Sequence, residues 1–191
     1  MAGITVLVSG EGTTLQNLID ASSEGPLRSE ILAVVADRNA RALDRARAAG
    51  IPTHLIPRKE HGEALSDRIL EAIPDGTELL VLAGFLSILT GSILERFKER
   101  IINIHPALLP KFGGPGMYGI RVHRAVISAG ERESGCTVHY VDEGTDTGPI
   151  LLQRKLKVLP NESPEELRNR VAVLEKSAVV EGVNMALERL P

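Results

Sequence analysis

An amide and an imidazole stand two positions apart, at Asn103 and His105, within the apolar run over residues 101–105. Successive side chains of a β-strand point to opposite faces, so in a strand these two polar groups leave the same face together. Pro106 follows directly and cannot donate to a central ladder, which places the pair at the carboxyl end of its strand. Open α/β sheets bind ligands beyond those ends. The spacing therefore indicates active-site residues, although taken alone it also fits a strand-end turn with a surface histidine.

A second polar segment, the acidic turn over residues 142–150, carries Asp146 just before Gly148-Pro149. Taken alone, Asp146 is an ordinary turn carboxylate. Together with the run from Asn103 to Pro110, however, it resembles the folate-dependent formyltransferases, whose pattern is Asn-x-His-Pro-x-Leu-Leu-Pro followed by an Asp shortly before Gly-Pro. The resemblance covers nearly the whole chain. It departs at Ala107, where the family usually has serine.

The resemblance implies transfer of a formyl group from 10-formyltetrahydrofolate, a co-substrate, to the amine of glycinamide ribonucleotide in purine synthesis. In that acyl transfer the neutral amine attacks the formyl carbon, and negative charge develops on the formyl oxygen. Asn103 and a protonated His105 are expected to stabilise this oxygen, where losing one donor typically costs about 3 to 4 kcal/mol. Asp146 is expected to orient the imidazole, raise its pKa and help carry away the amine proton through water. Direct attack needs no serine or cysteine nucleophile, and nothing in the sequence indicates an activated Cys136.

A turn rich in glycine and hydroxyl groups, residues 9–14, joins an apolar strand over residues 4–8 to a helix that begins near Leu15. The free N–H groups and positive dipole of such a helix start suit a phosphate. The turn lacks the third glycine of a dinucleotide fingerprint and the Gly-Lys-Ser/Thr of a P-loop, so it permits a simple monophosphate. A plain connection between strand and helix is the alternative. The resemblance assigns the phosphate of the ribonucleotide to Gly12, Thr13 and Thr14.

The resemblance places the pterin of the folate against the residues that follow a central apolar strand (79–84) and against the acidic turn. The family commonly has arginine where this chain has Ser87, which puts a side-chain contact from that position in doubt. The expected cofactor contacts are Leu86, Ile88, Leu89, Val141, Asp142 and Gly144.

On the ribonucleotide side the resemblance implies contacts from Pro106 and Glu175, although Glu175 also fits a solvated helix residue. The glycine-rich stretch over residues 111–119 predicts a loop. This loop is either a lid beside the site or a variable connection.

Strands alternating with helices predict a Rossmann-like, doubly wound α/β fold with a mostly parallel sheet and an antiparallel addition near the C-terminus. A capping box at Ser163–Glu166, with proline at the first helical position, begins the last helix, which reaches toward Arg189. Further strands are expected at residues 30–36, 51–56 at an edge, 136–141 and 150–153, and further helices at 42–49, about 60–72 and 121–129.

The 191 residues predict a single formyltransferase domain, 1–191, with a phosphate-binding half over about 1–100 and a folate and catalytic half over about 101–191. Lys and Arg total 22 against 25 Asp and Glu, a net charge of −3 without a basic block, which argues against nucleic-acid or membrane partners. The single cysteine and the absence of a secretory pattern predict the cytoplasm. Because no residues stand at zinc-ligand spacing, we expect no metal. Small molecules are the expected partners, and the chain is a monomer or a homodimer.

Two other functions stay open. One is a 10-formyltetrahydrofolate deformylase, a hydrolase that shares the Asn, His and Asp pattern but resembles this core joined to an N-terminal domain, whereas the first strand here begins at Ile4. The other is a non-catalytic nucleotide-binding module, against which Asn103, His105 and Asp146 together argue. A transferase acting on initiator tRNA is expected to carry a further C-terminal domain, and this chain stops at Pro191.

Overall fold

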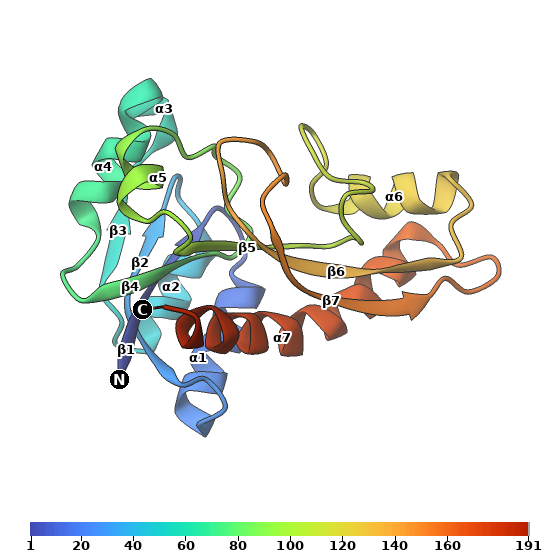
Figure 1. Ribbon diagram of the computed structural model, residues 1–191, viewed down its shortest axis with the longest axis horizontal. Coiled ribbons are helices and arrows are strands. Elements are labelled where there is room, and N and C mark those ends of the chain that lie inside the picture. Colours follow the sequence, from blue (N-terminus) through green and yellow to red (C-terminus); the bar gives the residue numbers. More distant parts are fainter. Residues whose placement is uncertain (191) are drawn as a thin grey trace.

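The computed structural model describes residues 1–190, which form one layered α/β structure (Figure 1). The strands are β1 (Ala2–Val8), β2 (Ser29–Ala36), β3 (Thr53–Leu55), β4 (Thr77–Leu82), β5 (Ile101–His105), β6 (Glu133–Tyr140) and β7 (Ile150–Lys157). They form a seven-stranded sheet in the order β3-β2-β1-β4-β5-β6-β7. The first five strands in that order pair in parallel, whereas β5, β6 and β7 pair antiparallel. The predicted fold class is confirmed.

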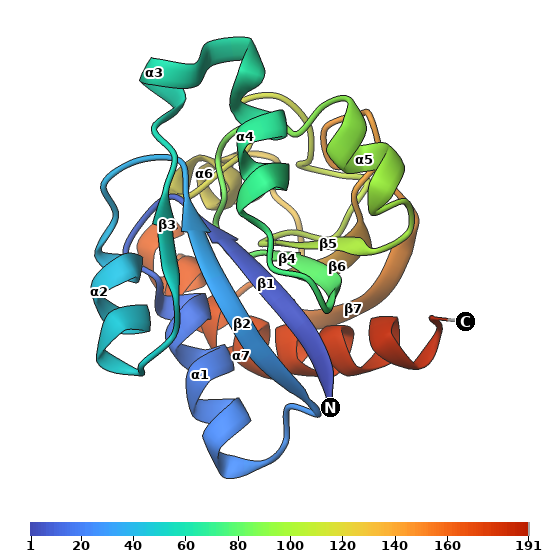
Figure 2. The same ribbon diagram turned by 90° about the vertical axis from the view of Figure 1, so that its left-hand side faces the viewer.

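Helices cover both faces of this sheet (Figure 2). They are α1 (Thr13–Glu24), α2 (Arg41–Ala48), α3 (Arg58–His61), the 3-10 turn η1 (Gly62–Ala64), α4 (Leu65–Ala72), α5 (Ser92–Arg96), α6 (Ile120–Ser128) and α7 (Pro164–Glu188). Residues of α1, α2 and α7 share one apolar core with the sheet, while residues of α4 and α5 share a second core with its other face. The central strands are therefore buried on both sides, which explains their apolar runs without alternation.

Strand β1 shows how one segment supplies both cores. Ile4, Val6 and Val8 point into the first core and Leu7 into the second, all four fully buried. Burial of each such side chain contributes about 1.5 to 3 kcal/mol relative to exposure. The sheet is thereby held rigid beneath the loops at its carboxyl edge.

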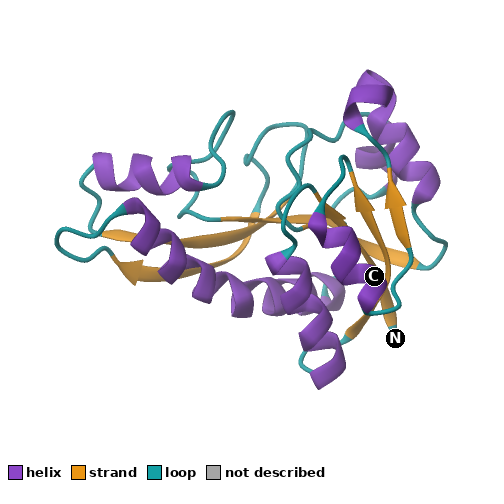
Figure 3. Ribbon diagram, turned by 180° about the vertical axis from the view of Figure 1, so that it is seen from behind, coloured by secondary structure: helices purple, strands orange, loops and turns teal. Residues whose placement is uncertain are grey.

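Helix α7 lies lengthwise along the sheet, as the view from behind shows (Figure 3). Its start is confirmed as a capping box: the N–H of Glu166 donates to the Ser163 hydroxyl at 3.2 Å, and the N–H of Ser163 donates to the Glu166 carboxylate at 2.8 Å. These bonds satisfy helix N–H groups that otherwise have no partner. None of the helices within residues 1–190 is long and apolar enough to cross a membrane.

The predicted helix over about 60–72 is wrong as a single element. The structure divides it into α3, η1 and α4, and the break lies at Gly62, whose backbone has φ +53° and ψ −120°. Only glycine adopts such a conformation at little steric cost. Strand β3 lies at the sheet edge as predicted but is shorter, and β7 extends four residues beyond the predicted end at 153, to Lys157.

Candidate active site

The amide of Asn103 and the imidazole of His105 lie at the carboxyl end of β5. The strand ends at His105, directly before Pro106, and the antiparallel pairing with β6 places His139 opposite Asn103. Asn103 is half-buried, and His105 is only 3% exposed. The alternate positions of these two residues put both side chains on one face of the strand, as the spacing predicts.

Asp146 reaches this strand end from the acidic turn between β6 and β7. One carboxylate oxygen, Oδ2, lies 3.5 Å from Nδ1 of His105, and the other, Oδ1, lies 3.5 Å from Nε2 of His139. Burial alone would raise the pKa of Asp146, but the hydrogen bond with His139, the neighbouring His105 and the N–H of Gly114 lower it below its usual range. Asp146 is therefore an ionised carboxylate between two imidazoles.

His139 lies beside the predicted catalytic residues, and it was not included among them in the sequence analysis. Its Nδ1 donates to the Tyr140 carbonyl at 2.9 Å, which leaves Nε2 facing Nδ2 of Asn103 at 3.2 Å. In the neutral ring Nε2 accepts from the Asn103 amide, and in the protonated ring it donates toward Asp146. The ring thus contacts both groups, and its protonation state decides which of them it holds by a hydrogen bond. No local pattern in the sequence shows this contact. His139 lies opposite Asn103 only once β5 and β6 pair in this register.

Opposing effects act on the pKa of His105. Burial lowers this pKa below the usual value, and burial outweighs the raising effects of Asp146 and of the hydrogen bond to Phe112, with His139 adding to the lowering. The raising effect of Asp146 is the expected one, whereas the larger effect of burial is not expected from the sequence. Nε2–H of His105 donates to the Phe112 carbonyl at 2.7 Å, and Nδ1 faces Oδ2 of Asp146 at 3.5 Å.

The glycine-rich loop over residues 111–119 lies against the site. The Phe112 carbonyl takes the Nε2–H of His105, and the N–H of Gly114 donates to Oδ2 of Asp146 at 3.0 Å. Phe112 itself has a left-handed backbone, with φ +58°. Of the two interpretations of this loop, a lid agrees with these contacts, since the loop backbone contacts two of the three predicted catalytic side chains.

The glycine- and hydroxyl-rich turn leads into α1, with Gly12 at the N-cap in a left-handed conformation, φ +73°. Because glycine has no side chain to cap the helix, the first N–H groups of α1 remain available to an anion. Thr13 is exposed and Thr14 is half-buried beside them. A Cβ on Gly12 would lie 2.7 Å from Ala42, so α2 packs directly against the turn. This geometry suits the predicted phosphate.

The three apolar residues predicted to meet the folate differ in exposure. Leu86 is 43% and Ile88 is 56% exposed, whereas Leu89 is buried in the second core. Leu89 therefore packs beneath the loop, and its side chain is not exposed at the surface. Ser87, between the two exposed residues, is buried.

The acidic turn offers its backbone and a carboxylate at the surface. Val141 is half-buried, and its N–H donates to the Ile101 carbonyl at 2.9 Å. Oδ1 of Asp142 accepts from the N–H of Gly144 at 3.0 Å and from the Thr147 hydroxyl at 2.6 Å. These bonds fix the conformation of the turn that also contains Asp146.

Glu175 lies on α7 and carries a second perturbed carboxyl. Burial raises its pKa to about 7, and within residues 1–190 the structure gives this carboxyl no hydrogen bond. Burial likewise raises the pKa of the Cys136 thiol to about 12, an effect to which the charge of Glu175 adds, so this thiol stays protonated.

Pro106 is half-buried next to His105. In the described part of the chain no three His, Cys, Asp or Glu side chains gather as ligands for one metal ion.

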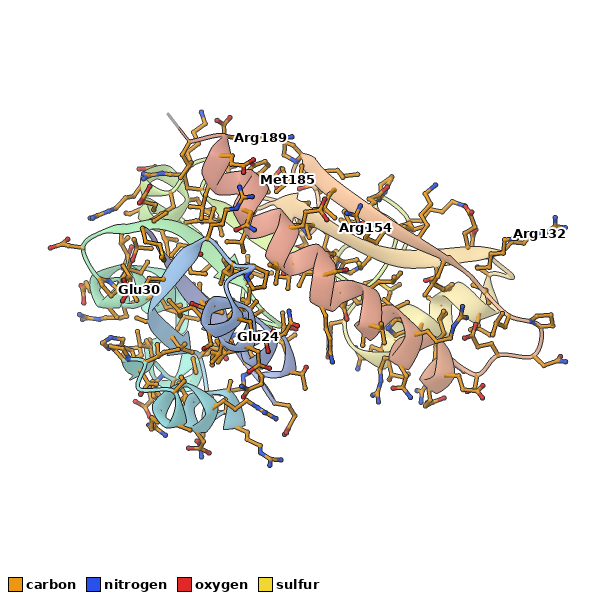
Figure 4. All side chains as sticks on the ribbon, turned by 90° about the horizontal axis from the view of Figure 1, so that it is seen from below. Glu24, Glu30, Arg132, Arg154, Met185 and Arg189 are labelled. Atoms are coloured by element: carbon orange, nitrogen blue, oxygen red, sulfur yellow. The ribbon has the colours of Figure 1, made fainter. Side chains whose placement is uncertain are left out.

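A hollow of about 580 Å³ is a groove between α1 and α7 on the side seen from below (Figure 4). Its lining includes Glu24 and Met185, which that view labels, but none of the predicted site residues. Both acidic and basic side chains line this groove. The candidate active site is the strand edge around His105.

Known proteins resemble this chain over nearly its whole length. The model of the family described as "Formyl transferase" matches residues 2–183. The chloroplastic phosphoribosylglycinamide formyltransferase of Arabidopsis thaliana is 38% identical over 190 residues, covering 97% of this chain and 65% of that protein. The phosphoribosylglycinamide formyltransferase of Haemophilus influenzae is 40% identical over 177 residues, covering 89% of this chain and 80% of that protein. The chain thus spans less than two thirds of the chloroplastic relative.

A solved structure shows the same fold. The phosphoribosylglycinamide formyltransferase of Coxiella burnetii, in complex with CHES, superposes with a TM-score of 0.90 at 39% sequence identity, covering 99% of this chain and 89% of that one. At this identity the likeness extends from the fold to the family.

Proposed function

The chain belongs to the formyl transferase family, and we propose that it transfers the formyl group of 10-formyltetrahydrofolate to the amine of glycinamide ribonucleotide, in purine synthesis. The observation that carries this proposal is the convergence of Asn103, His105 and Asp146 at one strand end, on a chain whose relatives bear that activity in their names. Formylfolate acts as co-substrate and no metal takes part. The other partners are small molecules, and the proposed compartment is the cytoplasm.

The reaction requires stabilisation of the formyl oxygen while the amine attacks. The amine nitrogen forms a bond to the formyl carbon, and the bond from that carbon to N10 of the folate then breaks. Nδ2–H of Asn103 and Nε2–H of His105 donate to the oxygen, on which negative charge develops. The imidazole N–H is a donor in the neutral and in the protonated ring, and His105 lies in a site shielded from water. The oxygen takes the place that the Phe112 carbonyl occupies in the structure, so the loop must shift when substrates bind.

Proton transfer completes the reaction. The amine loses one proton as it is acylated, and the leaving N10 gains one, so no proton is consumed overall. Asp146 is ionised and therefore able to accept the amine proton, through a water molecule, and to return it toward N10. Nε2 of His139 lies beside Asn103 and Asp146 and is able to hold one of them at a time during this exchange.

The remaining predicted contacts belong to two binding regions. The start of α1, with Gly12, Thr13 and Thr14, is proposed to hold the phosphate of the ribonucleotide, and Pro106 and Glu175 to contact the same substrate. Leu86, Ile88 and the acidic turn are proposed to face the pterin. We keep the division into a phosphate-binding half (1–100) and a folate and catalytic half (101–191) as part of this proposal.

The test is to incubate the protein with 10-formyltetrahydrofolate, with and without glycinamide ribonucleotide, and to measure tetrahydrofolate and formylated ribonucleotide. The proposal predicts that tetrahydrofolate release depends on the ribonucleotide and equals the amount of formylated product. Equal release into water alone would identify a deformylase instead. Ribonucleotide binding without any release would identify a non-catalytic module.

A further inference from the structure

Asp37 is a buried carboxylate that the proposed chemistry does not use. It follows β2 directly, and its side chain has no exposed surface. Arg38 donates to both of its oxygens, from Nε at 2.9 Å and from Nη2 at 2.8 Å. The Ser87 hydroxyl donates to Oδ2 at 2.5 Å. A buried charge is costly unless it is paired and hydrogen-bonded, so a carboxylate with this many donors is well held in place.

Three neighbouring strands of the sheet meet at this carboxylate. Ser9 follows β1, Asp37 follows β2, and Ser87 lies in the segment after β4, and these strands are adjacent in the order β2-β1-β4. The Ser9 hydroxyl is near enough to Asp37 to lower its pKa, and it accepts the N–H of Leu86 at 2.8 Å. One carboxylate thus links the beginning of the phosphate turn to the loop that is proposed to face the folate.

The exposure of that loop alternates around the anchored residue. Ser87 is 6% exposed, while its neighbours Leu86 and Ile88 are 43% and 56% exposed. The inward bond from Ser87 therefore turns the two apolar side chains outward. Farther along, the N–H of Thr90 donates to the Ser66 hydroxyl at 2.9 Å, and this bond fixes the other end of the loop.

The Asp37 carboxylate remains charged at neutral pH. Burial would raise its pKa, but the hydrogen bonds from Arg38, Ser87 and Ser9 lower it below the usual value. Hydrogen bonds to an ionised acceptor are about twice as strong as neutral ones. The Ser87 anchor is therefore a strong contact at physiological pH.

We propose that Asp37 is a positioning residue for the folate co-substrate: through Ser87 and Ser9 it holds Leu86 and Ile88 in the arrangement that receives the pterin. The naming of the co-substrate rests on the proposed function. In this chain the hydroxyl of Ser87 is directed into the protein, so Ser87 acts on the folate through the loop and makes no side-chain contact of its own. A loop that is already ordered binds its ligand with a smaller loss of conformational entropy.

Ser87→Ala removes the anchor alone, and Ser29→Ala is its matched control. Ser29 is also fully buried, and among residues 1–190 its hydroxyl has no hydrogen-bond partner; it lies at the opposite end of β2. Calorimetric titration with tetrahydrofolate should show that Ser87→Ala weakens binding roughly tenfold, which is about 1.4 kcal/mol. The KM for 10-formyltetrahydrofolate should rise by a similar factor, while kcat and the KM for the ribonucleotide stay within about twofold. Ser29→Ala should match wild type throughout.

Asp37→Asn serves as a second variant, in which the loss of folate affinity should exceed that of Ser87→Ala. The positioning role is overturned if Ser87→Ala binds tetrahydrofolate as tightly as Ser29→Ala does, or if it lowers kcat with folate affinity unchanged. A wild-type protein that binds tetrahydrofolate but formylates no ribonucleotide would contradict the proposed function instead. The comparison of dissociation constants would still decide the role of Asp37.

Discussion

At the residue scale, the proposed chemistry depends on a chain of polar contacts from Tyr140 through His139 to Asn103 and Asp146. His139 donates to a backbone carbonyl with one nitrogen and faces the amide and the carboxylate with the other. Such an arrangement fixes the direction in which the Asn103 N–H points. Oxyanion stabilisation is sensitive to that direction, because the donor must aim at the oxygen of the transition state.

His139→Ala should therefore lower kcat roughly tenfold, corresponding to about 1.4 kcal/mol of transition-state stabilisation. The reason is that Asn103 loses its orienting partner while His105 stays in place. Steady-state kinetics with both substrates varied would measure this effect. An unchanged kcat would contradict the positioning role of His139.

Glu175 allows a prediction in which stability and binding change in opposite directions. Its folded-state pKa of about 7 lies above the ordinary value of 4.5 for a glutamate, so the folded protein binds the extra proton and loses stability as pH rises from 4.5 through about 7. Glu175→Gln removes the buried charge. At pH 8 the variant should be more stable than wild type by about 2 to 3 kcal/mol, and at pH 4.5 the difference should vanish.

Urea unfolding at the two pH values measures this difference, and titration with glycinamide ribonucleotide should show weaker binding by the same variant. Equal stability gains at both pH values would contradict a buried, protonated carboxyl.

Asn103 and His105 could be predicted to lie together because strand alternation is a local property, whereas Asp146 was predicted from the family resemblance. Sequence reasoning missed His139, whose place depends on the register between two strands far apart in the chain. It predicted the raising effect of Asp146 on the pKa of His105 but not that the net shift is downward. That direction depends on how closely the loop around Phe112 excludes water, and only the packed structure contains that information.

At the element scale, the turn before α1 is shaped by its contact with α2. The N–H of Ala42 donates to the Gly10 carbonyl at 3.1 Å, and Arg45 donates to the Glu11 carbonyl at 2.8 Å. The composition of the turn predicts phosphate binding, but the supporting helix lies far enough along the chain that the sequence does not reveal the contact. The turn is consequently held by two elements, α1 and α2.

Gly12→Ala should disrupt this turn, because its φ of +73° disfavours a side chain and the new Cβ would lie 2.7 Å from Ala42. We expect the KM for glycinamide ribonucleotide to rise by roughly tenfold or more, with the KM for 10-formyltetrahydrofolate unchanged. Gly25→Ala is the matched control: its φ is +94°, but nothing lies within 4 Å of the added Cβ. If both variants raise the ribonucleotide KM equally, the contact with α2 has no part in binding.

At the scale of the whole molecule, His123 lies near both His105 of the candidate site and Arg168 of the last helix. It lies on α6, 1% exposed, with Nδ1 unpartnered within the described residues, and the neighbouring charged groups are Arg168 of α7 and His105 of β5. Burial, followed by the charges of Arg168 and His105, lowers its pKa to about 4. The folded protein thus keeps this imidazole neutral where the unfolded chain protonates it.

Stability should therefore fall as the pH drops from about 6.5 toward 4, because in that window the unfolded state binds more protons at this residue. His123→Asn should lose less stability than wild type between pH 7 and pH 4.5, by about 2 to 3 kcal/mol. Urea midpoints followed by circular dichroism at both pH values would measure the difference. Parallel losses in the two proteins would show that His123 is not buried neutral.

The central claim is that His105 donates to the formyl oxygen during transfer to the ribonucleotide amine. Its most direct test is the kcat of His105→Ala, with both substrates saturating and the fold confirmed by circular dichroism, against His61→Ala, which changes a histidine of α3 outside the site. We predict a loss of about 10²- to 10³-fold for His105→Ala, the effect of removing one oxyanion donor, and wild-type turnover for His61→Ala. A folded His105→Ala protein that formylates the ribonucleotide at nearly the wild-type rate would contradict the account.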